Sequence, residues 1–168
     1  MKVIGRLGAA VGIAAAVVLA TPSLASALAV TVPSSADLGT VPSGTSTLSA
    51  KLGAITVTAS GLVAPSFTAS VSGTTFTTGA GGVNQTIAKA SILYWSGPAT
   101  SVSGLLGSGT PGQATSAQAQ ALTTSRTAFS GTGLLLSISA TWNPTIVINF
   151  PSSIVTGTYT ATITHSVA

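Results

Sequence analysis

The last segment of the chain alternates between apolar and hydroxyl-bearing side chains. Residues 157–168 have the sequence GTYTATITHSVA, in which one face would carry Tyr159, Ala161, Ile163, His165 and Val167. Because successive side chains point to opposite faces of a strand, this pattern predicts a half-buried β-strand. Such a strand buries its apolar face only against a second layer, which the preceding chain must supply.

The same alternation recurs upstream, in segments separated by glycine and proline. It marks residues 28–32, 52–60, 67–72, 134–142 and 146–150, and extended pieces are also expected around Phe76 and over residues 86–95. Short strands at regular spacing predict an all-β fold, an immunoglobulin-like antiparallel β-sandwich of about seven to nine strands. Trp142, Phe150 and Tyr159 are the large side chains expected in its core.

Two segments lack this pattern. Residues 34–46 are rich in Gly, Pro and Ser, and they predict a loop in which Asp37 forms a turn. Residues 96–126 contain five Gly and two Pro without clear periodicity, so we expect a long Gly/Ser/Thr-rich excursion over the surface. Within this excursion, one or two helical turns are expected over residues 114–122.

The start of the chain has the pattern of a secretory signal peptide. Lys2 and Arg6 precede an uncharged apolar run over residues 7–20, and Ala25 and Ala27 form a small-x-small cleavage site before Leu28. The alternative, a membrane anchor, would need a longer run of about 20 apolar residues. We therefore expect a signal-peptide helix within residues 1–27 and a single secreted domain over residues 28–168. No later segment is long and apolar enough to span a bilayer, which predicts no membrane contact after processing.

Charge and cysteine content narrow the classes of function. Charged residues make up 4% of the chain, against about 25% in ordinary globular proteins. Beyond the leader only Lys51, Lys89 and Arg126 are basic, too few for the roughly 6–10 phosphate contacts of a strong nucleic-acid binder. The 45% hydrophobic content argues against disorder. Cysteine is absent, so packing and strand pairing must stabilise the exported chain without disulfides.

The titratable residues are too few for most enzyme chemistry. Beyond the leader there is one acidic side chain, Asp37, and one histidine, His165. This excludes a pair of catalytic carboxylates and a metal site of two histidines and a carboxylate. A triad of Asp37, His165 and a serine is the remaining arithmetic option, and the chain has no Gly-x-Ser-x-Gly elbow to favour it. We expect no catalytic, cofactor or metal site, with His165 facing inward at the rim of the sandwich.

Two other groups of residues could carry a function. Tyr94 and Trp95 are adjacent on a predicted strand, so only one of them can enter the core. The other is a candidate sugar-stacking or partner surface, or else an aromatic covered by the neighbouring loop. An internal Lys–Asn isopeptide bond from Lys51 or Lys89 is a further option, against the simpler expectation of two solvated lysines.

Four segments carry a resemblance to a known group of proteins. They are GAITV at 53–57, SFTASV at 66–71, YWSG at 94–97 and GTYTAT at 157–162. With them the chain resembles the small secreted β-domain proteins of Gram-positive bacteria, in particular actinobacterial relatives of the WxL surface-domain group, although it lacks the Trp-x-Leu signature. The resemblance implies a domain held at the cell wall without covalent attachment.

These observations predict a non-enzymatic protein of the cell surface, cell wall or matrix. Its expected partners are cell-wall polysaccharide, peptidoglycan or other surface proteins. Few charges protect the strand edges, which leaves self-association open. The alternative is a carbohydrate- or peptidoglycan-binding module that uses an exposed aromatic near Trp95.

Overall fold

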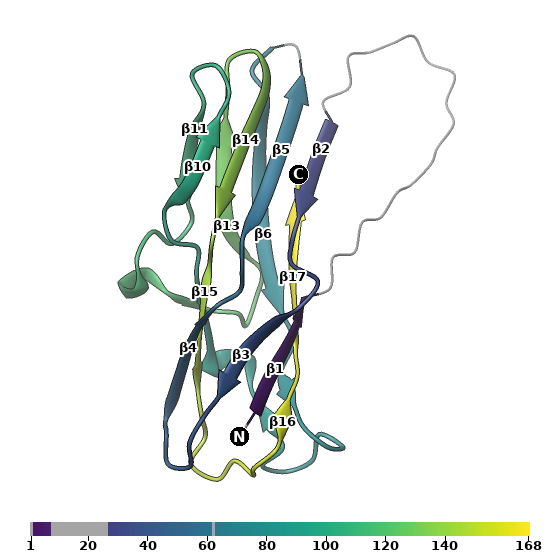
Figure 1. Cartoon of the computed structure of the whole chain (residues 1–168), viewed down its shortest axis with the longest axis vertical. Helices are drawn as coiled ribbons and strands as arrows, with labels where there is room; N and C mark the ends of the chain where they lie inside the picture. The colour runs from purple at the N-terminus through teal and green to yellow at the C-terminus, as the bar shows by residue number, and fades with distance from the viewer. Residues whose placement is uncertain (1, 8–26, 62) are drawn as a thin grey trace, which may run out of the picture.

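The computed structural model describes residues 27–61 and 63–168 in full, together with the backbone of residues 2–7. The described chain is all-β, with 17 strands, two 3₁₀ turns and no α-helix (Figure 1). In this part of the chain no helix is long and apolar enough to cross a bilayer. The predicted class is confirmed, but the expected number of strands is too low.

One sheet has seven strands in the order β11-β13-β6-β17-β1-β16, with β3 paired to β1. Its strands are β1 (Lys2–Leu7), β3 (Ala36–Thr40), β6 (Ser66–Gly73), β11 (Ser108–Pro111), β13 (Arg126–Thr132), β16 (Thr158–Tyr159) and β17 (Thr162–Val167). The pairs are antiparallel, except that β1 runs parallel to β16 and β17. Strand β17 is the terminal strand that the alternation predicts.

Two four-stranded antiparallel sheets have the orders β10-β14-β5-β2 and β12-β9-β15-β4. Their strands are β2 (Ala27–Thr31), β5 (Ile55–Gly61), β10 (Ala99–Ser103) and β14 (Leu136–Trp142), then β4 (Thr47–Lys51), β9 (Ile92–Trp95), β12 (Gln120–Ala121) and β15 (Thr145–Asn149). A small hairpin and two 3₁₀ turns complete the fold: β7 (Phe76–Thr77), β8 (Thr86–Ile87), η1 (Lys89–Ser91) and η2 (Ser116–Gln118).

The two four-stranded sheets follow one another along the same three stretches of chain. Strands β4 and β5, β9 and β10, and β14 and β15 are consecutive, and each pair is interrupted at the same level (Figure 1). Gly53 (φ +96°) and Gly97 (φ +71°) adopt left-handed conformations at two of these breaks, and Asn143-Pro144 makes the third. Across the break, the Leu52 amide donates to the Pro144 carbonyl at 2.9 Å. These interruptions are one reason why the strands are more numerous than the alternation predicts.

The sheets pack face to face around one hydrophobic core. Phe67, Ala69 and Val71 are the inward side chains of β6, and their polar neighbours point outward. From β13, Phe129 stacks on Trp142 of β14 with ring centroids 4.7 Å apart and planes 13° apart. Because β13 and β14 belong to different sheets, this stacked pair joins the two layers across the core.

Hydroxyl groups cover the outer face of the upper four-stranded sheet. The Thr56 and Thr141 hydroxyls lie 2.9 Å apart, and the Thr58 hydroxyl donates to Ser139 at 3.2 Å. These residues are cross-strand partners on β5 and β14, the positions where side-chain pairs stabilise a sheet. Neutral threonine and serine pairs thus provide the polar surface that charged residues provide in most proteins.

Three expectations need correction. The predicted loop over residues 34–46 contains strand β3, which pairs with β1. Residues 96–126 lie mostly at the surface but form β10, β11 and β12, and η2 provides the expected helical turn. The Gly- and Ser-rich edge strands escape detection because none of their side chains is fully buried, so they carry no clear apolar alternation. Leu134 and Leu136 are exposed, although the alternation places them in the core.

The leader is described only in part. Lys2–Leu7 forms strand β1, and the signal-peptide helix expected within residues 1–27 stays a prediction. Most of the predicted apolar run, residues 8–20, and the cleavage-site residue Ala25 lie outside the described residues. Ala27 and Leu28 are exposed at the start of β2, which leaves the predicted cleavage point accessible.

Candidate functional site

Tyr94 and Trp95 point to opposite sides of β9. Tyr94 is fully buried in the core, whereas Trp95 is half-buried on the outer face, beside the break at Gly97. The aromatic that is accessible to a partner is therefore Trp95. The sequence predicts that one of the two enters the core, and the structure assigns that place to Tyr94.

A buried trio forms where Tyr94 meets His165 and Trp142. The Trp142 Nε1–H donates to the Tyr94 hydroxyl oxygen at 3.3 Å, and that oxygen lies 3.2 Å from Nε2 of His165. The three residues come from β9, β14 and β17, so the trio spans all three large sheets. His165 faces inward as expected, but it is 3% exposed within the core and does not lie at a rim.

The trio holds one hydrogen too many for its acceptors. Nδ1 of His165 has no hydrogen-bond partner among the described residues. If Tyr94 donates to Nε2, the Nδ1–H of the imidazole has no acceptor, and in the other tautomer the phenol hydrogen has none. A protonated imidazole would leave the Nδ1–H and the phenol hydrogen of Tyr94 both without acceptors, and it would also bury a charge.

The electrostatics of the trio keep both groups neutral. Burial lowers the pKa of His165 to about 4, because the imidazolium would lose its hydration. Burial also raises the pKa of Tyr94, and this outweighs the opposite effect of the hydrogen bond from Trp142. His165 therefore carries no charge at neutral pH and has no carboxylate within reach, because Nδ1 is unpartnered among the described residues. The trio joins the three large sheets through buried, uncharged side chains.

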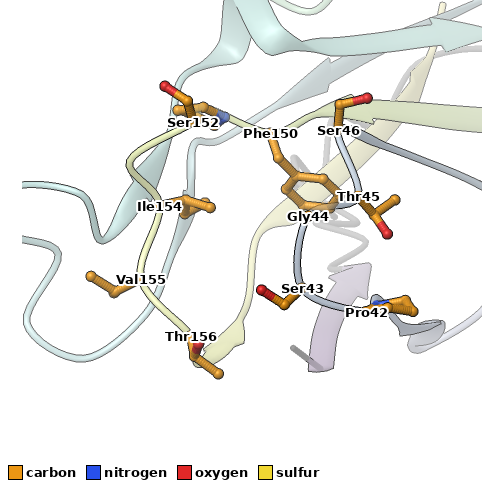
Figure 2. Close-up of a pocket in the computed structure, with 11 residues that line it drawn as sticks. Pro42, Ser43, Gly44, Thr45, Ser46, Phe150, Ser152, Ile154, Val155 and Thr156 are labelled. Carbon is orange, nitrogen blue, oxygen red and sulfur yellow. The ribbon is translucent and has the colours of Figure 1, made fainter.

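A separate hollow lies at the end of the molecule that carries β16. It has a volume of about 460 Å³ and lies between the β3–β4 turn and the β15–β16 segment. Figure 2 shows the Phe150 ring between the two segments, with Ser43 and Thr45 on one side and Ile154 on the other. The Phe150 amide donates to the Ser46 carbonyl at 2.8 Å, which ties the segments together at the base of the hollow. We call this hollow the Phe150 groove.

The Phe150 groove is neutral. Its lining combines one aromatic ring and aliphatic side chains with the hydroxyls of serines and threonines, and no charged residue takes part. Asp37 lies outside the lining, and its carboxylate accepts a hydrogen bond from the Gly39 amide at 2.9 Å. A groove of this kind can hold an uncharged polar ligand by contact with the ring and by hydrogen bonds to hydroxyls. It offers no acid, base or metal ligand, and the described residues contain no cluster that could hold a metal ion.

Phe150 was expected in the core, and the structure confirms this only in part. It packs against the core but is only half-buried, because it also lines the groove. Pro151 follows it directly and cannot continue the ladder, which is the signal that the strand ends here. Lys51 and Lys89, considered above for an isopeptide bond, are both exposed.

The chain matches no protein-family model, no curated protein and no solved structure.

Proposed function

We propose that this chain is an exported, non-enzymatic structural or interaction protein of the cell surface, cell wall or matrix. In this proposal residues 1–27 are removed, which takes β1 out of the seven-stranded sheet and leaves β3 without its partner strand. Residues 28–168 form an immunoglobulin-like β-sandwich from the remaining strands. The resemblance to the WxL surface-domain group stays a prediction. One observation carries the lack of enzymatic activity: the single histidine is sealed in the core with Tyr94 and Trp142, away from the neutral groove.

Cell fractionation tests the proposed location. We expect the protein in the medium or the wall fraction of a Gram-positive host, because the leader pattern directs it to the secretory route. A variant without residues 2–27 is the matched control and should remain in the cytosol. Full-length protein found only in the cytosol would refute the proposal.

A second candidate function is binding of cell-wall carbohydrate. Two observations favour it: the half-buried Trp95 ring on the outer face, and the neutral, hydroxyl-lined Phe150 groove. Sugars are uncharged and present both apolar faces and hydroxyls, which such surfaces can match. Binding at the outer face and binding in the Phe150 groove should be lost in different variants.

Retention on purified cell walls separates the two locations. If the outer face binds the wall, we expect Trp95→Ala to reduce retention about tenfold or more, as loss of an aromatic anchor typically does, while Phe150→Ala binds normally. The reverse result would place the ligand in the Phe150 groove. Circular dichroism must show that both variants keep the fold. No retention of the unmodified protein would exclude this candidate.

A further inference from the structure

Three loops gather at the end of the molecule opposite the Phe150 groove. They connect β5 to β6, β10 to β11 and β13 to β14, and they lie at the top of Figure 1. Backbone hydrogen bonds join them: the Leu134 amide donates to the Leu105 carbonyl at 2.9 Å, and the Ala64 amide donates to the Leu134 carbonyl at 2.7 Å. The three loops therefore form one surface.

This surface is apolar throughout. Six of its large hydrophobic side chains are between 41% and 77% exposed: Val63, Leu105, Leu106, Leu134, Leu135 and Leu136. We call these six residues the leucine tip. The charged residues of the described chain all lie outside these loops: Lys2 and Arg6 in β1, Asp37, Lys51, Lys89 and Arg126. Isolated exposed leucines are ordinary, but a contiguous apolar patch at one end of a monomer indicates an interaction site.

The backbone of the tip is strained. Ala64 (φ 45°), Leu106 (φ 51°) and Leu136 (φ 65°) adopt left-handed conformations, and they are three of the four non-glycine residues with positive φ in the described chain. Such conformations are uncommon for leucine and carry an energetic cost, and they concentrate at functional sites. Two of the strained residues, Leu106 and Leu136, are leucines exposed to solvent. Asparagine or glycine would adopt the same left-handed conformation at a lower free-energy cost.

The chain itself indicates what this end of the molecule faces. Strand β2 begins at Ala27, which pairs with Ser60 next to the β5–β6 loop. The apolar run of the leader ends at Ala20, so seven residues, at most about 25 Å of extended chain, connect it to this end. In the structure residues 2–7 pair with β16 and β17, but during the proposed export the leader lies in the membrane and the short connection holds the leucine tip close to the bilayer.

We infer that the leucine tip inserts into a lipid bilayer and holds the processed protein at the outer face of the cell membrane. The inference rests on the proposed export of the chain. The sequence analysis predicts no membrane contact after processing, but that prediction considers only segments long enough to span a bilayer. Insertion of a surface tip needs no such segment. The tip lies at one end of the long axis of the molecule (Figure 1), so it can enter the acyl region of a bilayer, whereas two such ends would meet over only a small area. Because the tip has no charge, it binds neutral and anionic lipids alike.

The absence of cysteine allows a direct test. The exported protein carries a single polarity-sensitive nitrobenzoxadiazole label, at Leu135→Cys in the tip or at Val83→Cys as the matched control. Val83 is 89% exposed, and its neighbour Asn84 accepts a hydrogen bond from the Val155 amide beside the Phe150 groove, so the control lies at the far end. We expect phosphatidylcholine and phosphatidylglycerol vesicles to shift the label at position 135 to the blue, and to leave the label at position 83 unchanged.

A second variant tests whether the leucines drive insertion. Asparagine tolerates the left-handed conformation, so Leu106→Asn with Leu136→Asn should keep the fold and the urea midpoint. We expect this variant to lower vesicle partitioning about tenfold or more, because it removes exposed apolar groups.

Three results would overturn the inference: no response at position 135, an equal response at both positions, or unchanged partitioning of the asparagine variant. A response at position 135 that rises with protein concentration in the absence of vesicles would assign the tip to a second copy instead. If the intact mass still includes residues 1–27, only the proposed export is refuted. The membrane inference is tested separately, because the label reports whether position 135 itself enters the bilayer.

Discussion

Replacing Trp142 with alanine is expected to lower the free energy of unfolding by about 3–5 kcal/mol. The indole is fully buried, stacks on Phe129 at 4.7 Å and donates its hydrogen bond to Tyr94. The substitution therefore leaves a cavity between the sheets and removes the partner of a buried hydroxyl. Against a typical total stability of about 5–15 kcal/mol, this loss is large enough to unfold a weak domain.

The second tryptophan supplies the matched control. Trp95 is half-buried on the outer face, so Trp95→Ala should shift the urea midpoint much less than Trp142→Ala. Urea unfolding followed by circular dichroism measures both variants without depending on tryptophan fluorescence. Equal losses for the two variants would show that Trp142 does not join the sheets as described.

Acid is expected to destabilise the protein through His165. Burial lowers the pKa of this imidazole to about 4 in the folded state, while an unfolded histidine has a pKa of about 6.5. Between these values the unfolded chain binds a proton that the folded chain does not, so stability falls as the pH falls. The slope approaches about 1.4 kcal/mol per pH unit, and the total loss between pH 6.5 and pH 4 is about 3 kcal/mol.

The composition of the chain makes this effect easy to isolate. It contains one histidine and one acidic side chain, so few other groups titrate on acidification. In His165→Phe the dependence of the urea midpoint on pH should flatten between pH 6.5 and pH 4, whatever the variant costs in absolute stability. Tyr94→Phe retains the buried imidazole and should keep the slope. An unchanged slope in His165→Phe would assign the proton uptake to another group.

The inward faces of the long strands could be predicted from alternation alone. Tyr159, Ala161, Ile163 and His165 are all buried, as the pattern of the terminal segment requires. In these strands the apolar side chains are the ones that pack in the core, so the alternation in the sequence indicates which face is buried. Alternation therefore predicts burial correctly for these strands.

Prediction failed where other forces act. Strand β3 contains Asp37 and Gly39 and resembles a loop, because its pairing with β1 uses the backbone and leaves little trace in the side chains. Leu134 and Leu136 extend an apparent strand pattern, but the left-handed turn at Leu136 directs them into solvent. Three consecutive leucines break strict alternation, and this was the available signal.

The sites needed the fold. Tyr94, Trp142 and His165 could each be recognised as notable residues, yet their meeting depends on the order of the strands, which alternation does not encode. The Phe150 groove joins two segments that are about a hundred residues apart in the chain. Its lining of serine, threonine and proline has the same composition as any exposed turn. Only the three-dimensional structure distinguishes it.

We propose that the chain works outside the cell after losing its leader. The intact mass of the protein recovered from the medium or wall of a Gram-positive host tests this most directly. We expect a chain that begins at Leu28 and lacks residues 1–27. A mass that includes the leader, or recovery of the protein from the cytosol alone, would contradict it.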